Sequence, residues 1–201
     1  MSVDCLRDGL ARYLPEDKRE KLAAASIGIA GAGGLGSNVA LLLARSGIEK
    51  MLVIDKDRVD ASNLNRQQYW PRHLGMRKTE ALRELLLELN PRMEIEIYND
   101  EIDAGNLDAL IRRRDIWIEA LDGAELKRRF AERAAARAAF VAAASGICGI
   151  GGDPLMKRKL GNLLIVGDYQ SDLCDAPPFA PRVIQAAALM ADGVLEYILD
   201  S

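Results

Sequence analysis

The stretch Ile27-Gly-Ile-Ala-Gly-Ala-Gly-Gly-Leu-Gly-Ser37 decides the fold of this chain. A short apolar run leads into Gly31, Gly33 and Gly36, which have G-x-G-x-x-G spacing, and helix-forming residues follow at 38–45. The pattern predicts a strand, a tight turn and a helix. Gly31 would permit the turn, Gly33 would let backbone N–H groups approach a phosphate, and Gly36 would let helix and strand pack closely.

A second apolar run, Met51 to Asp55, predicts another buried strand, and this one ends in an acidic residue. A carboxylate at that distance from the glycines can accept hydrogen bonds from the two hydroxyls of a ribose. Glycine turns also occur for packing alone, and Asp55 could instead cap a neighbouring helix. The strand, helix and acid together favour a nucleotide site, and this half of the chain leaves NAD, FAD and ATP open.

Composition and charge restrict the class of protein. The chain has 201 residues, of which 49% are hydrophobic and 28% charged, as in ordinary soluble domains. Its net charge of -3 provides no general basic field for nucleic acid or anionic membranes. No apolar stretch is long enough to span a bilayer, and the first residues lack the layout of a signal peptide. We therefore expect a cytoplasmic protein with no membrane or nucleic-acid partner.

The three cysteines, Cys5, Cys148 and Cys174, are widely spaced, odd in number and contain no C-x-x-C pair. This spacing argues against a disulfide scaffold and against a four-thiolate zinc site.

The rest of the chain alternates between strand and helix patterns, which predicts right-handed crossovers and parallel strands. We expect an α/β fold, Rossmann-like and doubly wound, with a mainly parallel sheet and a short antiparallel C-terminal portion that includes residues 163–166. Residues 1–201 would form a single domain. Residues 1–25 would be an N-terminal helical arm, and residues 167–181 a mobile crossing loop.

Polar groups from separate parts of the sequence are expected at one edge of this sheet. The irregular segment 57–70 follows a strand end, Lys78 begins the next helix, and Asp122 follows a later strand. A nicotinamide site has no evident use for an arginine and a lysine beside another acid, whereas a triphosphate does. Arg66 and Lys78 could neutralise phosphate oxygens, and Asp122 could hold Mg²⁺.

Each of these roles has a structural alternative. Arg66 could pair with Asp57 or Asp60, and Asp122 could be a turn residue before a glycine. A lysine at a helix start is disfavoured by the helix dipole, which favours a functional role for Lys78.

Five motifs in this order resemble the ubiquitin-activating superfamily in its bacterial ThiF/MoeB/HesA branch, over residues from about 10 to the end. They are Gly31-Ala-Gly-Gly-Leu-Gly-Ser37, Asp55-x-Asp57-x-Val59, Ser62-Asn-Leu-Asn-Arg-Gln67, Gly75-x-x-Lys78 and Leu121-Asp122. The short length and the ending from Ala180 to Ala188 are similar to the short ThiF subfamily, adenylyltransferases for the sulfur carrier ThiS.

The resemblance implies a reaction and its partners. The C-terminal glycine carboxylate of a ubiquitin-like sulfur carrier ending in Gly-Gly would attack the α-phosphorus of ATP and release pyrophosphate, in thiamine thiazole biosynthesis. ATP and Mg²⁺ would be the cofactors, with no zinc, and a homodimer is implied. A neighbouring branch would instead be a dehydratase acting on threonylcarbamoyl-adenosine in tRNA, and a non-catalytic nucleotide-binding module is the third alternative.

The resemblance also implies roles for individual residues. Asp55 would bind the ribose, Asn63 and Arg66 the phosphates, Lys78 the phosphates or leaving pyrophosphate, and Asp122 the magnesium. The implied nucleotide site is completed by Gly31, Gly33, Gly34, Gly36 and Asp57, and the implied catalytic set by Arg66, Lys78, Asp122 and Cys174. The glycine-rich bend at 145–152 and the loop at 167–181 would flank the carrier tail.

The chain departs from the family pattern in the arm and after the fourth strand. Pro15 stands where many relatives carry a second arginine that reaches a partner subunit, which leaves Arg12 as the candidate. Asp122 is followed by glycine where asparagine is common. Cys174 could accept sulfur or be an incidental loop cysteine, and His73 is expected at the surface.

Overall fold

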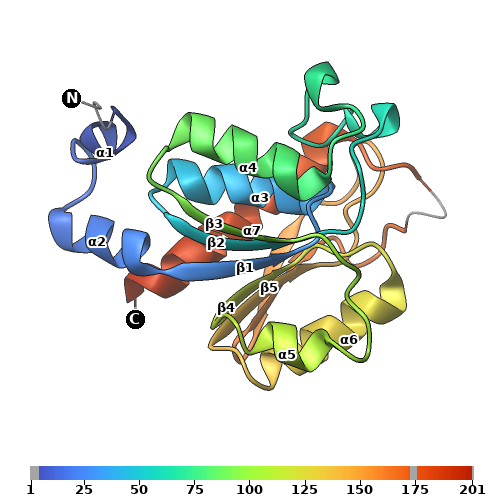
Figure 1. Ribbon diagram of the computed structural model, residues 1–201. Coiled ribbons are helices and arrows are strands. Elements are labelled where there is room, and N and C mark those ends of the chain that lie inside the picture. Colours follow the sequence, from blue (N-terminus) through green and yellow to red (C-terminus); the bar gives the residue numbers. More distant parts are fainter. Residues whose placement is uncertain (1–4, 173–175, 201) are drawn as a thin grey trace.

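The computed structural model describes residues 5–172 and 176–200, and these residues form one seven-stranded sheet (Figure 1). The strand order across the sheet is β3-β2-β1-β4-β5-β7-β6. The strands are β1 (Ser26–Ala30), β2 (Lys50–Ile54), β3 (Glu94–Tyr98), β4 (Ile116–Glu119), β5 (Phe140–Ala144), β6 (Met156–Leu160) and β7 (Leu163–Gly167). Neighbouring strands run parallel except β6 and β7, which pair antiparallel.

Helices cover both faces of the sheet. They are α1 (Cys5–Leu10), α2 (Glu16–Ala24), α3 (Gly34–Arg45), α4 (Lys78–Leu89), α5 (Leu107–Ile111), α6 (Ala124–Ala135) and α7 (Ala180–Asp200), with short 3₁₀ turns at Ala61–Asn63 and Pro71–His73. Helices α3, α4 and α7 cover one face, and α5 and α6 cover the other, as Figure 1 shows.

The predicted fold class is confirmed: the sheet is mainly parallel, doubly wound and Rossmann-like, with an antiparallel C-terminal portion. Residues 163–166 lie in β7, which pairs parallel with β5 as well as antiparallel with β6. The strand that reverses direction is therefore β6, for which the sequence pattern gave no prediction.

Residues 5–24 contain the two helices α1 and α2, which are separated by a break around Tyr13 and Pro15. Figure 1 shows α1 and α2 at the end of the molecule away from the loops that follow the parallel strands. The side chain of Arg12 is exposed there, so any contribution of this arginine to a nucleotide site would have to be made to another chain.

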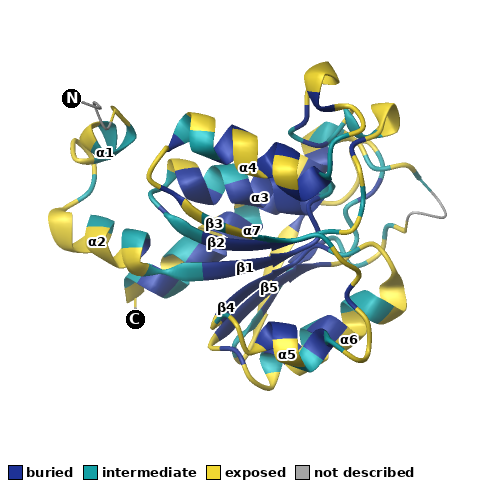
Figure 2. Ribbon diagram, viewed as in Figure 1, coloured by how far each residue is buried: buried dark blue, intermediate teal, exposed yellow. Residues whose placement is uncertain are grey.

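Two apolar clusters hold the helices to the sheet, and the central strands are buried between them (Figure 2). In the smaller cluster, the ring of Trp117 on β4 meets Phe130 on α6 edge to face. Gly28 on β1 makes room for this indole, because a Cβ atom there would lie 2.5 Å from the ring. The α6 face of the sheet is thus packed around one large aromatic residue.

Among residues 5–172 and 176–200, no helix combines the length and apolar character that crossing a membrane would require.

Candidate nucleotide-binding site

The glycine turn between β1 and α3 has the geometry that its sequence predicts. Gly31 has a φ of +96°, and a Cβ atom there would lie 2.3 Å from the carbonyl oxygen of Ala120. A Cβ atom at Gly36 would lie 1.8 Å from the carbonyl oxygen of Gly31. Helix α3 begins at Gly34 with no side-chain cap, so its first N–H groups remain available to an anion.

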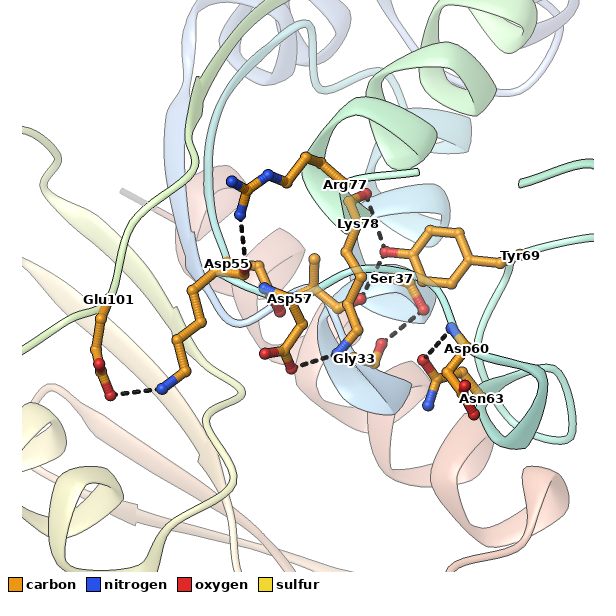
Figure 3. A network of polar contacts seen from close by, with 12 residues as sticks. Gly33, Ser37, Asp55, Asp57, Asp60, Asn63, Tyr69, Arg77, Lys78 and Glu101 are labelled. Carbon is orange, nitrogen blue, oxygen red and sulfur yellow. Dashed lines mark hydrogen bonds and ion pairs between the residues drawn. The ribbon is translucent and has the colours of Figure 1, made fainter. Parts of the chain in front are cut away.

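Asp55, the residue after β2, holds this turn from the side (Figure 3). Its Oδ2 accepts a hydrogen bond of 2.7 Å from the backbone N–H of Ala32, and its Oδ1 accepts one of 2.8 Å from the N–H of Asp57. Burial raises the pKa of Asp55, and the charge of Lys78 and the two N–H donors oppose that rise. Asp55 does not cap α3, whose N-terminus has no side-chain cap, but it ties the glycine turn to the next loop. Its contact with a ribose stays a prediction.

Tyr69 supports the same turn from the other side, and sequence reasoning missed it. Its hydroxyl lies 2.6 Å from the carbonyl oxygen of Ala32 and 3.2 Å from that of Lys78 (Figure 3). The side chain is 4% exposed, and burial raises the pKa of its hydroxyl well above the ordinary value. Tyr69 therefore remains a neutral donor that joins the glycine turn to the start of α4.

The segment that carries Arg66 is tied to the first turns of α3. Asn38 donates its side-chain N–H groups to the carbonyl oxygens of Gly34, at 2.6 Å, and of Arg66, at 3.0 Å. The hydroxyl of Ser37 accepts a hydrogen bond of 3.2 Å from the backbone N–H of Gln68. These bonds place the arginine beside the helix N-terminus, although its position in sequence is remote from the glycines.

The guanidinium of Arg66 binds locally and has no acidic partner among the described residues. Its Nη1 donates to the carbonyl oxygen of Ser62 at 3.0 Å and to Oδ1 of Asn65 at 2.8 Å. The predicted alternative, an ion pair with Asp57 or Asp60, is not formed. The positive charge of Arg66 is therefore free to meet an anion.

Lys78 is the first residue of α4 and is only 5% exposed. Its Nζ lies 2.8 Å from Oδ2 of Asp57 (Figure 3), and its backbone N–H donates to the carbonyl oxygen of Asp57 at 3.0 Å. A buried ammonium at a helix N-terminus is costly unless an anion compensates it, and a single half-exposed carboxylate does so here.

Asn63 has a structural contact in the same loop. Its Oδ1 accepts a hydrogen bond of 3.0 Å from the backbone N–H of Asp60, which closes a capping box with the bond from Ser62 to the Asp60 carboxylate (Figure 3). The amide nitrogen of Asn63 is the end of the side chain left to face a ligand.

One cleft of about 930 Å³ at the carboxyl ends of the strands brings these groups together. Its lining includes the predicted site residues Gly34, Asp57, Asn63, Arg66, Lys78 and Asp122. The predicted residues that do not line it are Gly31, Gly33, Gly36 and Asp55, which build the turn next to it. Cys174 lies outside the described residues.

A buried ion pair that sequence reasoning missed forms part of the cleft beside Asp122. Glu119, at the end of β4, is 1% exposed and pairs with Nζ of Lys127 on α6 at 2.9 Å. Burial raises the pKa of Glu119, while Lys127 and the backbone N–H of Leu121 oppose the rise. A glutamate that ends an otherwise apolar strand was the available sequence signal for this pair.

The far wall of the cleft comes from two loops. It is lined by Ser145 to Cys148, which belong to the glycine-rich bend after β5, and by Ser171 and Asp172, which follow β7. Burial raises the pKa of the Cys148 thiol, so this cysteine is a packed thiol rather than an activated nucleophile.

Mg²⁺ is compatible with the residues around Asp122. In proteins this ion commonly takes one or two carboxylates together with phosphate oxygens and water. Asp122 and Glu119 are the nearby carboxylates, but Glu119 already has a lysine partner. Within the described residues, no group of three or more potential metal ligands comes together. If Mg²⁺ binds here, Asp122 would provide a single carboxylate, and phosphate oxygens would have to complete the coordination.

The prediction that His73 lies at the surface is wrong. This histidine is fully buried, because the 3₁₀ turn Pro71–His73 folds back toward α4. Its Nδ1 accepts a hydrogen bond of 2.9 Å from the backbone N–H of Trp70, and its Nε2 lies 3.5 Å from Oε1 of Glu84. The basic run of α6, in contrast, is exposed, with Arg128 paired to Glu125 and Glu132.

These features define a class of protein. A glycine turn at an uncapped helix N-terminus, a buried lysine and an arginine without an acidic partner in the described part of the chain converge at the carboxyl edge of a doubly wound sheet, which is the arrangement of a nucleotide-binding α/β domain. Within that class, the chain belongs to the ThiF family, whose profile matches residues 7–164.

Curated relatives match about half of the chain. Residues of this chain are 39% identical over 113 positions to a probable molybdopterin-synthase adenylyltransferase from Porphyra purpurea, covering 54% of this chain and 30% of that protein. They are 38% identical over 95 positions to ubiquitin-like modifier-activating enzyme 5 from Caenorhabditis elegans, covering 47% and 23%. The chain thus matches less than a third of the length of these relatives.

Solved structures share the fold. The E. coli tRNA N6-threonylcarbamoyladenosine dehydratase TcdA, in complex with AMP, superposes with a TM-score of 0.87 at 20% identity, covering 100% of this chain and 98% of that chain. E. coli MccB with ATP superposes with a TM-score of 0.69 at 24% identity, covering 91% and 58%. At these identities the likeness shows the fold alone.

Proposed function

We propose that this chain is an ATP-dependent adenylyltransferase that activates the C-terminal glycine of a ubiquitin-like sulfur carrier protein, with a ThiS-like carrier of thiamine thiazole biosynthesis as the partner. The observation that carries the proposal is the cleft in which Arg66, Lys78 and Asp122 meet the N-terminus of α3. Membership of the ThiF family supports it, as do the relatives that are named adenylyltransferases.

The charges in the cleft suit a triphosphate better than a dinucleotide. Gly34 offers backbone N–H groups, Arg66 offers a guanidinium without an acidic partner among the described residues, and Lys78 offers a buried ammonium. Together they neutralise the negative charge that phosphate oxygens bring into a partly buried site. A nicotinamide dinucleotide has two bridging phosphates and needs fewer positive groups.

The chemistry requires alignment more than proton transfer. A carrier's C-terminal carboxylate is ionised at neutral pH, so it attacks the α-phosphorus without a general base. Its oxygen forms the bond to phosphorus, and the bond to the bridging oxygen of the leaving pyrophosphate breaks. Arg66 and Lys78 would hold the phosphates in line and stabilise the charge on the leaving group. Asp122 would hold Mg²⁺, which supplies further charge neutralisation.

Asp55 and Asn63 have supporting parts in this proposal. Asp55 holds the glycine turn through Ala32 and would keep one lone pair per oxygen for a ribose hydroxyl. The amide nitrogen of Asn63 would donate to a phosphate, since its oxygen is engaged by Asp60. Cys174 would remain the candidate acceptor of sulfur, and a homodimer the proposed assembly.

The direct test is pyrophosphate exchange into ATP, measured with Mg²⁺ and with several purified ubiquitin-like sulfur carriers that end in Gly-Gly. We expect exchange that depends on a carrier and stops when its last glycine is removed. Arg66→Ala and Asp122→Ala should each lower the rate by about 100-fold, the usual effect of removing one group that stabilises transition-state charge.

Arg72→Ala is the matched control, because Arg72 is half-exposed and pairs with Glu84 and Glu88, away from the cleft. It should exchange at the wild-type rate. Absence of exchange by the wild-type protein with every carrier would reject the activity, and wild-type rates in the Arg66 and Asp122 variants would reject the site.

The dehydratase alternative has one supporting observation, the superposition of the whole chain on TcdA. The net charge of -3 argues against a tRNA partner. Binding of tRNA that weakens steeply with salt, together with carrier-independent ATP consumption, would favour this alternative over carrier activation.

A further inference from the structure

Arg182 occupies an unusual place, the first turn of α7. It is only 7% exposed, and the dipole of a 21-residue helix disfavours a cation at this end. The adjacent residue, Val183, packs against the phosphate-binding turn: a Cβ atom at Gly34 would lie 3.1 Å from its Cγ1. The first turn of α7 thus contacts the phosphate end of the cleft directly.

The guanidinium of Arg182 is held by groups from the two loops behind the far wall. Its Nη2 pairs with Oδ2 of Asp168, just after β7. Its Nη1 donates to the carbonyl oxygens of Gly151, in the glycine-rich bend, and of Asp153, directly after it. One side chain therefore ties α7 to both loops.

Asp168 connects Arg182 to the far wall of the cleft. Its Oδ1 accepts hydrogen bonds from the backbone N–H groups of Gln170, at 2.9 Å, and Ser171, at 2.8 Å. Burial alone would raise the pKa of Asp168, but these N–H donors and Arg182 outweigh it and hold the pKa below its ordinary value. The carboxylate is therefore ionised whenever the protein is at neutral pH.

The two loops are also joined to each other. The hydroxyl of Ser171 accepts a hydrogen bond of 3.1 Å from the backbone N–H of Cys148, and the N–H of Asp168 donates to the carbonyl oxygen of Gly146 at 2.9 Å. A Cβ atom at Gly146 would lie 2.1 Å from Oδ1 of Asp168, so the bend packs directly on this carboxylate. Gly146, Cys148 and Ser171 all line the cleft.

A purely structural ion pair is the simpler explanation of Arg182 and Asp168. Buried ion pairs contribute little to stability relative to apolar residues of the same size, because desolvation offsets their attraction. Here the hydrogen bonds and the ion pair of the guanidinium all reach backbone carbonyl oxygens or a carboxylate in the two loops that form the far wall of the cleft. The pattern fits a role in shaping the cleft.

We propose that Arg182 is a positioning residue: through Asp168 and the 151–153 backbone it fixes the wall at 145–148 and 171–172 relative to Gly34. The wall would then hold the carboxylate-bearing tail of the acyl substrate in line with the α-phosphorus of ATP. This inference rests on the proposed function and adds to it a residue that touches neither substrate.

The test separates binding of the nucleotide from alignment of the second substrate. In Arg182→Ala, calorimetry with ATP and Mg²⁺ should give a Kd within about threefold of wild type, because the phosphate groups are unchanged. The kcat of carrier-dependent exchange should fall about 100-fold, the cost of a misplacement of roughly 1 Å. Guanidinium ion added in solution should restore part of the kcat of this variant, and should leave Arg72→Ala unchanged.

Arg182→Lys provides a second variant that keeps the charge if the alanine variant does not fold. A lysine cannot bind Asp168 and two carbonyl oxygens in the fixed geometry of a guanidinium, so its kcat should also fall while its ATP affinity is retained. Wild-type kcat in Arg182→Lys, or a loss of ATP affinity parallel to the loss of kcat, would overturn the proposal.

Hydrogen–deuterium exchange tests the inference separately from the activity. In the Arg182 variants, amides of 145–153 and 168–171 should exchange faster than in wild type, and amides of 31–37 should not. If the wild-type protein shows no carrier-dependent activity, the proposed function fails, but hydrogen–deuterium exchange still shows whether Arg182 holds the two loops in place. Equal exchange rates in the two loops would overturn the positioning role even if the enzyme is active.

Discussion

Replacement of Tyr69 by phenylalanine tests how the glycine turn is held. The hydroxyl of Tyr69 lies 2.6 Å from the carbonyl oxygen of Ala32 and 3.2 Å from that of Lys78, in a buried environment. Removing it leaves the Ala32 acceptor without this donor and adds no strain, because phenylalanine fills the same ring volume.

The expected cost follows from the burial of these groups. A net intramolecular hydrogen bond contributes about 1 kcal/mol, and an unsatisfied buried acceptor costs about 1–3 kcal/mol. We therefore expect Tyr69→Phe to lower the free energy of unfolding by about 1–2 kcal/mol. For a chain of this size that corresponds to a fall in Tm of roughly 2–8 °C. ATP affinity should also fall, since Ala32 lies within the turn.

Tyr13→Phe is the matched control, because Tyr13 is 84% exposed and lies between the two helices of the arm. Its Tm and ATP affinity should equal those of wild type. Calorimetric melting of the three proteins measures the first quantity, and titration with ATP and Mg²⁺ measures the second. A Tyr69→Phe protein as stable as Tyr13→Phe would refute the argument that this hydroxyl supports the turn.

Two further predictions concern a backbone contact and a buried carboxyl. Gly36→Ala should destabilise the protein by several kcal/mol and abolish ATP binding, because its Cβ atom would lie 1.8 Å from the carbonyl oxygen of Gly31. Urea titration measures the loss of stability, and Gly9→Ala, which has open space around it, should be nearly neutral in this assay. Burial raises the pKa of Glu119 in the folded protein, so as pH rises this carboxyl group loses its proton in the unfolded state before it does so in the folded state. The free energy of unfolding should therefore fall as pH rises from about 4.5 through the raised pKa. In urea titrations between pH 4 and 8, Glu119→Gln should lack that fall, and an identical pH profile in both proteins would contradict the reasoning.

Most of the fold could be predicted from local patterns. Apolar runs such as Met51 to Ile54 are buried on both faces, and the alternation of strand and helix patterns limits the topology to a few choices. Strand β6 could not be predicted, because its residues Met-Lys-Arg-Lys-Leu are all exposed and show no period of two. It is a strand because the neighbouring β7 offers a free edge for pairing.

In the candidate site, too, some features could be predicted from the sequence and others could not. Arg66, Lys78 and Asp122 follow motifs at recognisable spacings, and the cleft brings them together as predicted. His73 was placed wrongly, since a loop sequence after Pro71 gives no sign that the turn folds inward against α4. That Asp55 binds a ribose and that Cys174 accepts sulfur are still predictions.

The strand–turn–helix unit, the mainly parallel sheet and the positive side chains at its carboxyl edge could all be predicted from the sequence, because they depend on residue type and short spacing. That Tyr69 holds the glycine turn, that Glu119 is buried with Lys127, and that Arg182 joins α7 to both loops of the far wall became visible only in the folded chain. Tyr69 and Arg182 join segments that are distant in sequence, and the pair of Glu119 with the nearby Lys127 depends on how α6 packs against the end of β4. The free energy of such a contact depends on burial and distance, which local residue patterns do not contain.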